Sequence, residues 1–236
     1  MLSFTILLPV MDETDSLTKT VDILTSLEES SYICEYLIIV SLYTSAKSMA
    51  CIESLKQKYG SKIICYTQQK PFIGNALKES FALMNGTHAV LMASDLETDP
   101  ASLTTMISKS LQYPQAIISA SRWLNENCFE GYGFLKKACN YVFQKIAALL
   151  YGVSLTDMTY AYRIYPKKVL QSIAFKETKH PFFLESLLMP IRHHYQVFEV
   201  PTKWAKRIEG ESRQGFFKNF DYFRVLLKCR IAKVLV

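Results

Sequence analysis

Short runs of hydrophobic residues alternate with longer amphipathic stretches through the first half of the chain. The runs show no polar alternation, which is typical of strands that are buried on both faces of a sheet. They cover residues 4–10, 36–40, 63–66, 89–93 and 116–120. The stretches between them have helical length and cover about 15–30, 46–59, 74–86 and 100–112. This order predicts βαβ units, and therefore an α/β fold with a mostly parallel central sheet flanked by helices.

The second half of the chain has a less regular pattern. Residues 133–152 and 181–193 are expected to be helical, 159–165 and 197–201 to form strands, and 201–215 to form a polar, basic loop. The last segment, 216–236, spaces its apolar residues three or four apart, which predicts an amphipathic helix. Its apolar stripe comprises Phe216, Phe220, Phe223, Leu227, Ile231 and Leu235. We therefore expect one domain over 1–215, followed by a basic amphipathic helix over 216–236.

The composition is that of a folded protein, and its positive charge is local. Half of the 236 residues are hydrophobic and 20% are charged, which excludes a disordered chain. Residues 201–236 hold nine Lys/Arg and three acidic residues, which accounts for the whole net charge of +6. A local basic patch favours a diphosphate or a lipid headgroup as partner, whereas nucleic-acid binding is not expected.

Cysteine usage and hydropathy bear on the compartment. The six cysteines are scattered and form no Cys-x-x-Cys pair, which fits a reducing compartment. The first apolar run lacks a preceding basic region, so it is not expected to be a signal peptide. No apolar stretch approaches the roughly 18 residues of a membrane-spanning helix. We expect a cytoplasmic protein, either free or peripheral on the inner face of the membrane.

The strongest chemical signal follows the fourth apolar run. In open α/β sheets, ligands bind at the carboxyl ends of the strands, and this run is followed by Asp95, Glu97 and Asp99. Residues two apart in an extended segment point the same way, so Asp95 and Glu97 are expected to bind one Mg²⁺ or Mn²⁺ together with substrate phosphates. Asp99 precedes Pro100 and is instead expected to cap the next helix.

Two further segments carry candidate chemistry. The basic loop contains Arg207, Gly210 and Ser212, which suit phosphate oxygens, although an ordinary basic surface loop is the alternative. A metal together with arginines is one way in which proteins bind a diphosphate leaving group, so a metal site strengthens the phosphate interpretation. In the second segment, Asp157 and Arg163 bracket two tyrosines. A strand with Asp157 paired to an arginine is the structural alternative there.

Six short motifs, in order along residues 3–213, resemble the family 2 glycosyltransferases and within them the dolichol-phosphate mannosyltransferase-like branch. The opening I-L-L-P-V-M-D-E resembles the family's first strand and P-x-x-N-E turn, and A-S-D-L-E resembles its D-A-D-L-Q motif. The others are Gly74-Asn75-Ala76, Ser121-Arg122, the stretch 157–163, and Glu199-Val200-Pro201 with Arg207 and Gly210-Glu211-Ser212. The resemblance implies a GT-A fold.

The resemblance also implies an activity: metal-dependent, inverting transfer of a hexose from a nucleotide sugar. The acceptor would be a lipid phosphate or a saccharide, in cell-surface glycan or glycolipid synthesis. Asp95 and Glu97 would hold the metal, while Asp157 and Arg163 would line the acceptor side as catalytic candidates. A saccharide hydroxyl needs a base, for which Asp157 is the candidate, whereas a lipid phosphate needs none. The residues that would contact the nucleotide sugar are Pro9, Asp12, Glu13, Ser41, Asp95, Arg122, Arg207 and Ser212.

The chain departs from the family pattern at two places. The family's V-D-D-G-S after the second strand is replaced by a segment that begins at Ser41, and Ala93 replaces the first aspartate of the metal motif. The alternative is therefore a weakened or inactive nucleotide-sugar-binding protein of the same fold. A nucleotidyltransferase is a weaker alternative, because the turn after the first strand is acidic and has no glycine.

The C-terminal segment 216–236 has two interpretations. As a peripheral membrane anchor, it would insert phenylalanines and place its lysines and arginines at the headgroups. As a structural helix, it would pack its apolar stripe on the domain or on the second subunit of a homodimer.

Overall fold

A computed structural model of the chain describes residues 1–125, 133–207, 209 and 220–233. Within these residues, seven strands form one sheet in the order β3-β2-β1-β4-β6-β5-β7. The neighbours pair in parallel except β6, which is antiparallel to both β4 and β5. The strands are β1 (Phe4–Pro9), β2 (Ile33–Val40), β3 (Ile63–Thr67), β4 (His88–Leu91), β5 (Ile117–Ser121), β6 (Arg163–Pro166) and β7 (Val197–Pro201).

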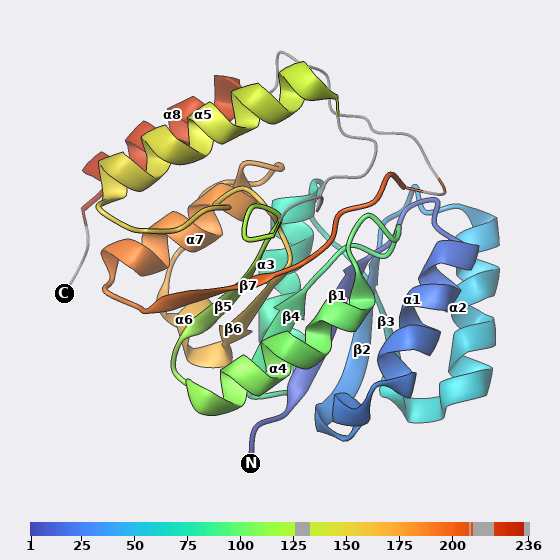
Figure 1. Ribbon diagram of the computed structural model, residues 1–236. Helices are drawn as coiled ribbons and strands as arrows, with labels where there is room; N and C mark the ends of the chain where they lie inside the picture. The colour runs from blue at the N-terminus through green and yellow to red at the C-terminus, as the bar shows by residue number, and fades with distance from the viewer. Residues whose placement is uncertain (126–132, 208, 210–219, 234–236) are drawn as a thin grey trace.

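Helices cover both faces of the sheet (Figure 1). One face carries α1 (Asp15–Ser26), α2 (Ala46–Tyr59) and α4 (Leu103–Gln112). The other carries α3 (Ile73–Leu83), α5 (Phe134–Tyr151), α6 (Lys167–Ser172), α7 (Phe182–Arg192) and α8 (Phe220–Ile231). Short 3-10 helices span Glu28–Tyr32, Gly60–Lys62 and Pro100–Ser102. The predicted α/β fold with a mostly parallel sheet is therefore confirmed.

The alternation of side chains along β1 explains why its sequence shows no polar positions. Ile6 and Leu8 pack with Leu17 and Val21 of α1 in the hydrophobic cluster on one face. Leu7 points the other way, into the cluster formed with α3, α5 and α7. All of these side chains are buried, so every position of the strand is apolar except Thr5, whose hydroxyl donates to the buried carboxylate of Glu35. A strand covered on both faces has no side that selects for polar residues.

The predicted elements of the first half match the structure to within a few residues, and those of the second half less closely. The strand expected over 159–165 begins only at Arg163, and α6 was not expected at all. The structure confirms Asp99 as a cap, since its Oδ1 accepts the Ala101 amide at 3.1 Å. This cap begins a 3-10 turn that leads directly into α4.

The C-terminal helix α8 packs on the domain through a different face from the predicted one. Val225, Leu226 and Cys229 are buried, while Phe223, Leu227 and Ile231 of the predicted stripe are exposed. The interpretation in which this stripe packs on the domain is therefore wrong for Leu227 and Ile231, whereas the partly exposed Phe223 meets the ring of Phe143. Residues 216–219 and 234–236 lie outside the described residues. No described helix has the length and apolar character needed to cross a bilayer.

Candidate active site at the carboxyl ends of the strands

The turn after β1 brings two predicted nucleotide-binding residues next to the loop after β4. Glu13 closes this turn, because its Oε2 accepts the backbone amides of Met11 at 2.7 Å and Asp12 at 3.1 Å. The Ser94 hydroxyl donates to the Pro9 carbonyl at 3.1 Å, which ties the two loops together. Pro9 and Glu13 therefore lie beside the segment that contains Asp95. Asp12 lies in the same turn and is exposed.

Asp95 and Glu97 converge on one side chain, but through a turn and not through strand alternation. Leu96 has a left-handed backbone with φ of 60°, and the Glu97 amide donates to Asp95 Oδ1 at 3.1 Å. The expectation of an extended segment is therefore wrong, since a turn brings the two carboxylates together. Both reach Arg207, with Nε 2.8 Å from Glu97 Oε1 and an Nη2 3.3 Å from Asp95 Oδ2.

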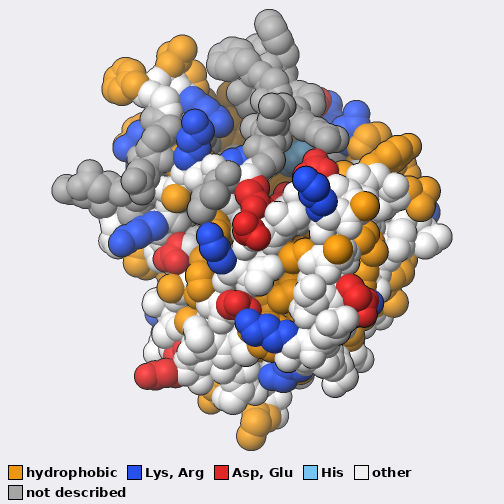
Figure 2. Space-filling model, turned by 90° about the vertical axis from the view of Figure 1, so that its right-hand side faces the viewer, with side chains coloured by type: hydrophobic (Ala, Val, Ile, Leu, Met, Phe, Trp, Pro, Cys, Tyr) orange, Lys and Arg blue, Asp and Glu red, His pale blue; other side chains and the backbone are white. Residues whose placement is uncertain are grey.

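The segment before Arg207 is held against the loop after β4 by its backbone. Trp204 forms an isolated antiparallel bridge with Thr98, and the Ala205 amide donates to the Glu97 carbonyl at 3.4 Å. Two residues after Arg207, the Glu209 carboxylate accepts the Thr14 amide at 2.9 Å and the Ser16 hydroxyl at 2.9 Å, at the start of α1. Figure 2 shows acidic and basic side chains close together on the face of the molecule that it draws.

Asp95 is an unusual carboxylate because it is almost completely buried. Only 5% of the residue is exposed, and this burial raises the pKa of its carboxyl to about 6. The negative charges of Glu97 and Glu13 raise the pKa further, whereas the Glu97 amide and Arg207 lower it. One guanidinium therefore only partly compensates the charge that gathers here.

This pair of carboxylates fits a hard divalent cation. Carboxylate oxygens are the protein ligands that Mg²⁺ and Mn²⁺ prefer, and a cationic guanidinium already bridges the two groups. No cluster of three or more acidic, histidine or cysteine side chains suited to a metal occurs in the described part of the chain. The protein would thus supply two ligands, and substrate phosphates and water the others.

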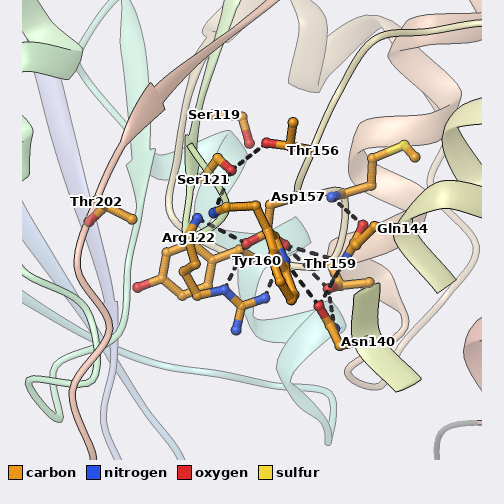
Figure 3. A network of polar contacts seen from close by, with 12 residues as sticks. Ser119, Ser121, Arg122, Asn140, Gln144, Thr156, Asp157, Thr159, Tyr160 and Thr202 are labelled. Atoms are coloured by element: carbon orange, nitrogen blue, oxygen red, sulfur yellow. Dashed lines mark hydrogen bonds and ion pairs between the residues drawn. The ribbon is translucent and has the colours of Figure 1, made fainter. Parts of the chain in front are cut away.

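A second aspartate–arginine pair lies after β5 and is enclosed by hydrogen bonds (Figure 3). Arg122 donates to Asp157 through Nε at 2.7 Å and Nη2 at 3.0 Å, and its backbone amide donates at 3.2 Å. The Arg122 guanidinium also lies over the Tyr160 ring, 4.4 Å from its centroid. Gln144 of α5 adds a fourth donor to Asp157, at 3.3 Å. Charge-assisted, bidentate pairs of this kind are among the strongest hydrogen bonds in proteins.

A carboxylate on β7 holds the loop that carries Asp157. Glu199 accepts the backbone amides of Thr156 at 2.7 Å and Asp157 at 2.8 Å. Burial raises the pKa of the Glu199 carboxyl, and these amide donors oppose the rise. Asp157 itself is completely buried. Its burial and its donors argue against the predicted role as a base on the acceptor side and favour the structural alternative.

Arg163 also lies in the core of the domain. The residue is fully buried and begins β6. Its guanidinium donates to Ser119 Oγ at 3.1 Å, to the Met158 carbonyl at 2.7 Å, and to Tyr165 and the Phe183 carbonyl. This placement contradicts the prediction that Arg163 lines the acceptor side. The sequence pattern places an arginine at this position but carries no information about its burial.

The end of β2 offers hydroxyl groups where the resemblance leads one to expect carboxylates. The Ser41 hydroxyl accepts the Tyr43 amide at 3.1 Å, and the Thr44 hydroxyl donates to the Val10 carbonyl at 3.0 Å. These groups stabilise the turn itself. Leu42 and Tyr43 are exposed next to it. Ser212 and Gly210 of the predicted phosphate loop lie outside the described residues.

Two residues of the Arg122–Asp157 cluster were not singled out from the sequence. Gln144 is buried on α5, where it donates to Asp157 and accepts the Met158 amide at 2.8 Å. Its signal is a polar residue between Phe143 and Ala147 on the buried face of the helix. The Tyr160 ring stacks on the Arg122 guanidinium. No sequence pattern distinguishes this tyrosine as a buried residue.

No family model matches the chain. Several solved structures share its fold. Glucosyl-3-phosphoglycerate synthase from Mycobacterium tuberculosis, in complex with Mn²⁺, UDP and phosphoglyceric acid, superposes with a TM-score of 0.73 at 14% identity, over 99% of this chain and 80% of that one. The same enzyme with Mn²⁺, UDP-glucose and glycerol 3-phosphate gives 0.70 at 14%, over 97% and 80%. A mycobacterial protein gives 0.73 at 14%, over 97% and 74%.

These neighbours confirm the fold predicted from the sequence. The mixed, mostly parallel sheet with helices on both faces is that of GT-A glycosyltransferases. The neighbours named here include nucleotide-sugar glycosyltransferase structures with Mn²⁺ and UDP-glucose bound. The more specific resemblance to the dolichol-phosphate mannosyltransferase-like branch stays a prediction from the sequence motifs.

Proposed function

We propose that this chain is a metal-dependent glycosyltransferase that moves a hexose from a nucleotide sugar to a phosphate-bearing acceptor in glycolipid or surface-glycan synthesis. The observation that carries the proposal is the Asp95–Glu97–Arg207 cluster. It lies at the carboxyl edge of a GT-A-type sheet, where open α/β sheets bind ligands. The Mn²⁺ and UDP-glucose in the neighbours' complexes support a divalent metal and a nucleotide-sugar donor.

Each residue of the cluster has a distinct role in this proposal. Asp95 and Glu97 would hold the Mg²⁺ or Mn²⁺, which would supply positive charge to the departing nucleoside diphosphate. Arg207 pairs with the two carboxylates in this structure, and would be available to the donor phosphates if a metal took its place between them. Its forked donors suit phosphate oxygens as well as they suit carboxylates. Pro9 and Glu13 shape the turn beside the nucleotide.

The geometry favours a phosphate over a sugar hydroxyl as the attacking group. The bond from the anomeric carbon to the diphosphate oxygen breaks while the acceptor oxygen forms a new one. A hydroxyl must lose its proton in this step, but Asp157, the predicted base, already accepts hydrogen bonds from Arg122 and Gln144 of its own chain. A phosphate needs no base. Phosphoglyceric acid and glycerol 3-phosphate, which are bound in the neighbours' complexes, support a phosphate-bearing acceptor, but each also carries a free hydroxyl and so does not identify the attacking group. Inversion at the anomeric carbon stays a prediction.

A second candidate is a nucleotide-sugar-binding protein without transferase activity. The end of β2 favours it, because Ser41 and Thr44 use their hydroxyls within the turn and present no carboxylate to a nucleotide. Weak donor binding with no turnover is the expected behaviour of such a protein.

Thermal unfolding with a panel of UDP- and GDP-sugars, each with and without Mn²⁺, tests the proposal. A ligand that binds only the native state raises the unfolding midpoint by mass action. We expect a Mn²⁺-dependent rise with one donor, which is absent in Asp95→Ala. The matched control is Asp99→Ala, which removes a carboxylate from the same loop at a cost of about 1 kcal/mol for the lost cap, and should keep the rise.

The outcomes separate the two candidates. A rise with one donor, followed by release of nucleoside diphosphate when a phosphate acceptor is added, supports the transferase. A rise without turnover on any phosphate or saccharide acceptor supports the binding protein. No rise with any donor at millimolar concentration contradicts both.

A further inference from the structure

Helix α5 carries a stripe of hydrophobic side chains on its outer surface. Leu135 and Leu149 are 68% and 86% exposed, and Val142 and Ile146 between them are also exposed. These positions are three, four or seven residues apart, so they lie along one side of the helix. The opposite side is buried through Phe143 and Ala147. A helix that is apolar on two sides in this way has one apolar side that stays exposed among the described residues.

Helix α8 extends this apolar surface. It lies beside α5 on the outside of the molecule (Figure 1), where the Tyr151 hydroxyl donates to the Leu226 carbonyl at 2.8 Å. The Phe143 and Phe223 rings meet edge to face, with centroids 4.9 Å apart. Phe223 therefore lies at the junction of the helices, and it begins the exposed stripe that continues through Leu227 and Ile231. We call the exposed apolar residues of both helices the α5–α8 face.

The same two helices hold a marked excess of positive charge. Lys136, Lys137 and Lys145 are the only charged residues of α5, and all are basic. Residues 220–233 contain four basic residues against Asp221. Arg224 and Lys228 pair with Glu177, which fixes α8 to the loop before α7. Lys145, Arg230 and Lys233 are exposed. An apolar stripe flanked by basic residues matches the interior and the headgroups of an anionic bilayer.

The α5–α8 face begins next to the candidate active site. Trp123 follows β5 by two residues, and its indole donates to Asn140 of α5 at 3.2 Å. Its ring also lies 5.2 Å from that of Tyr141. A surface docked along α5 would therefore come close to the edge of the sheet at which Asp95 and Arg122 lie.

We propose that the α5–α8 face docks the protein on the surface of an anionic phospholipid bilayer. Interfacial helices bury an apolar side at the level of the headgroups while their lysines and arginines contact anionic lipids. A second copy of the chain is a poorer occupant, because a symmetric contact would bring the lysines of two α5 helices together. The main docking element is α5, and α8 adds to it through Phe223, Leu227 and Ile231 instead of forming the anchor alone.

Docking has a consequence for the acceptor, and this consequence rests on the proposed function. If α5 lies in the headgroup layer, the carboxyl edge of the sheet comes to the level of the lipid phosphates. A lipid-borne phosphate could then reach the candidate active site. The substrate class would then be a membrane lipid phosphate and not a soluble sugar phosphate. Docking itself does not depend on catalysis, so the two ideas are testable separately.

Vesicle pelleting tests the docking surface. The full chain is incubated with vesicles of phosphatidylcholine alone, and with vesicles of equal parts phosphatidylcholine and phosphatidylglycerol. We expect binding to the anionic vesicles only, weakened by high salt, and reduced at least about tenfold in Leu135→Ser/Leu149→Ser. The matched control is Leu83→Ser/Leu111→Ser, which changes two exposed leucines on α3 and α4 and should bind as the unchanged protein does.

Three results would overturn the proposal. These are no pelleting with anionic vesicles, equal pelleting of both double variants, or a dimer in sedimentation velocity that Leu135→Ser/Leu149→Ser dissociates while vesicle binding is absent. Thermal unfolding with the donor sugar and Mn²⁺ separates this failure from failure of the proposed function. Leu135→Ser/Leu149→Ser should keep the donor-dependent rise of the midpoint, because neither leucine contacts the Asp95–Glu97–Arg207 cluster.

Discussion

Two aspartate–arginine clusters lie at the same edge of the sheet, and they differ in how completely their charges are satisfied. In the first, Asp157 is fully buried and accepts hydrogen bonds from Arg122 and Gln144. In the second, Asp95 and Glu97 share Arg207, whose closest approach to Asp95 is 3.3 Å. The sequence presents both as an acid and an arginine near a strand end, but their surroundings differ.

This difference in charge compensation indicates which cluster is suited to bind a further ligand. A buried charge that already has a bidentate partner gains little from a further cation, so the Arg122–Asp157 pair acts as a fixed part of the scaffold. Among the described residues, the second cluster holds two carboxylates against one guanidinium, and burial raises the pKa of Asp95 to about 6. An added divalent cation would relieve that excess of negative charge. Perturbed carboxylates of this kind gather at functional sites.

The largest expected effect comes from breaking the satisfied cluster. Asp157→Ala removes the bidentate carboxylate that pairs with the buried Arg122 guanidinium, and it should lower the free energy of unfolding by about 3–5 kcal/mol. Asp157→Asn keeps an acceptor for Gln144 and should cost less. Urea denaturation measures both. A loss below about 1 kcal/mol for Asp157→Ala would show that water reaches Arg122, and would return Asp157 to the list of acceptor-side candidates.

The first half of the fold was predictable because its strands are covered on both faces. Continuous apolar runs such as 4–10 have no other common explanation in a chain with helical stretches between them. The short β6 was less predictable, since the tyrosines before it are buried by loop packing and resemble strand residues. Its first residue, Arg163, shows the limit for the site. A motif places an arginine in order along the chain, but its burial depends on Ser119 and Phe183, which are distant in sequence.

The convergence of Asp95 and Glu97 was predicted, although for the wrong reason, and their role as metal ligands stays a prediction. Asp95 and Glu97 do converge, through a turn in which Leu96 takes a left-handed backbone. That conformation is uncommon for leucine, so no residue pattern predicts it here. The role of Arg207 as their shared partner was also not visible, because the contact joins residues more than 100 positions apart.

Removing the charge of Asp95 should raise the free energy of unfolding, whereas removing that of Asp157 should lower it. The change at Asp95 should be the smaller of the two. Its pKa is raised in the folded state, so the native protein binds a proton that the unfolded chain has already lost. Stability should therefore fall as the pH rises from about 4 to about 6, and the cost is fully present at pH 7. Asp95→Asn does not titrate, and without metal it should be more stable at pH 7 by about 1–3 kcal/mol.

Thermal unfolding at pH 4 and pH 7 checks this sign. The gain of Asp95→Asn should shrink towards pH 4, where the native carboxyl is protonated. The control Asp99→Asn should change little, because asparagine also caps a helix start. If Asp95→Asn is less stable than the unchanged protein at pH 7, the charge of the Asp95 carboxylate is better compensated than its burial indicates. The contrast between the two clusters then fails.

The smallest effect is expected from removing the arginine that the two carboxylates share. Metal binding to Asp95 and Glu97 has to displace Arg207, so Arg207→Gln should raise the affinity for Mn²⁺ alone several-fold, a change of about 1 kcal/mol. The same change should weaken donor binding in the presence of metal, because the guanidinium no longer meets the phosphates. Arg224→Gln removes an arginine that pairs with Glu177 instead, and should alter neither affinity. Calorimetric titrations with Mn²⁺ alone, and with donor at saturating Mn²⁺, separate the two effects.

If Arg207→Gln weakened Mn²⁺ binding, the guanidinium would be organising the carboxylates for the metal instead of competing with it. Arg207 would then hold its cluster together as Arg122 does, and the two pairs would differ only in their burial.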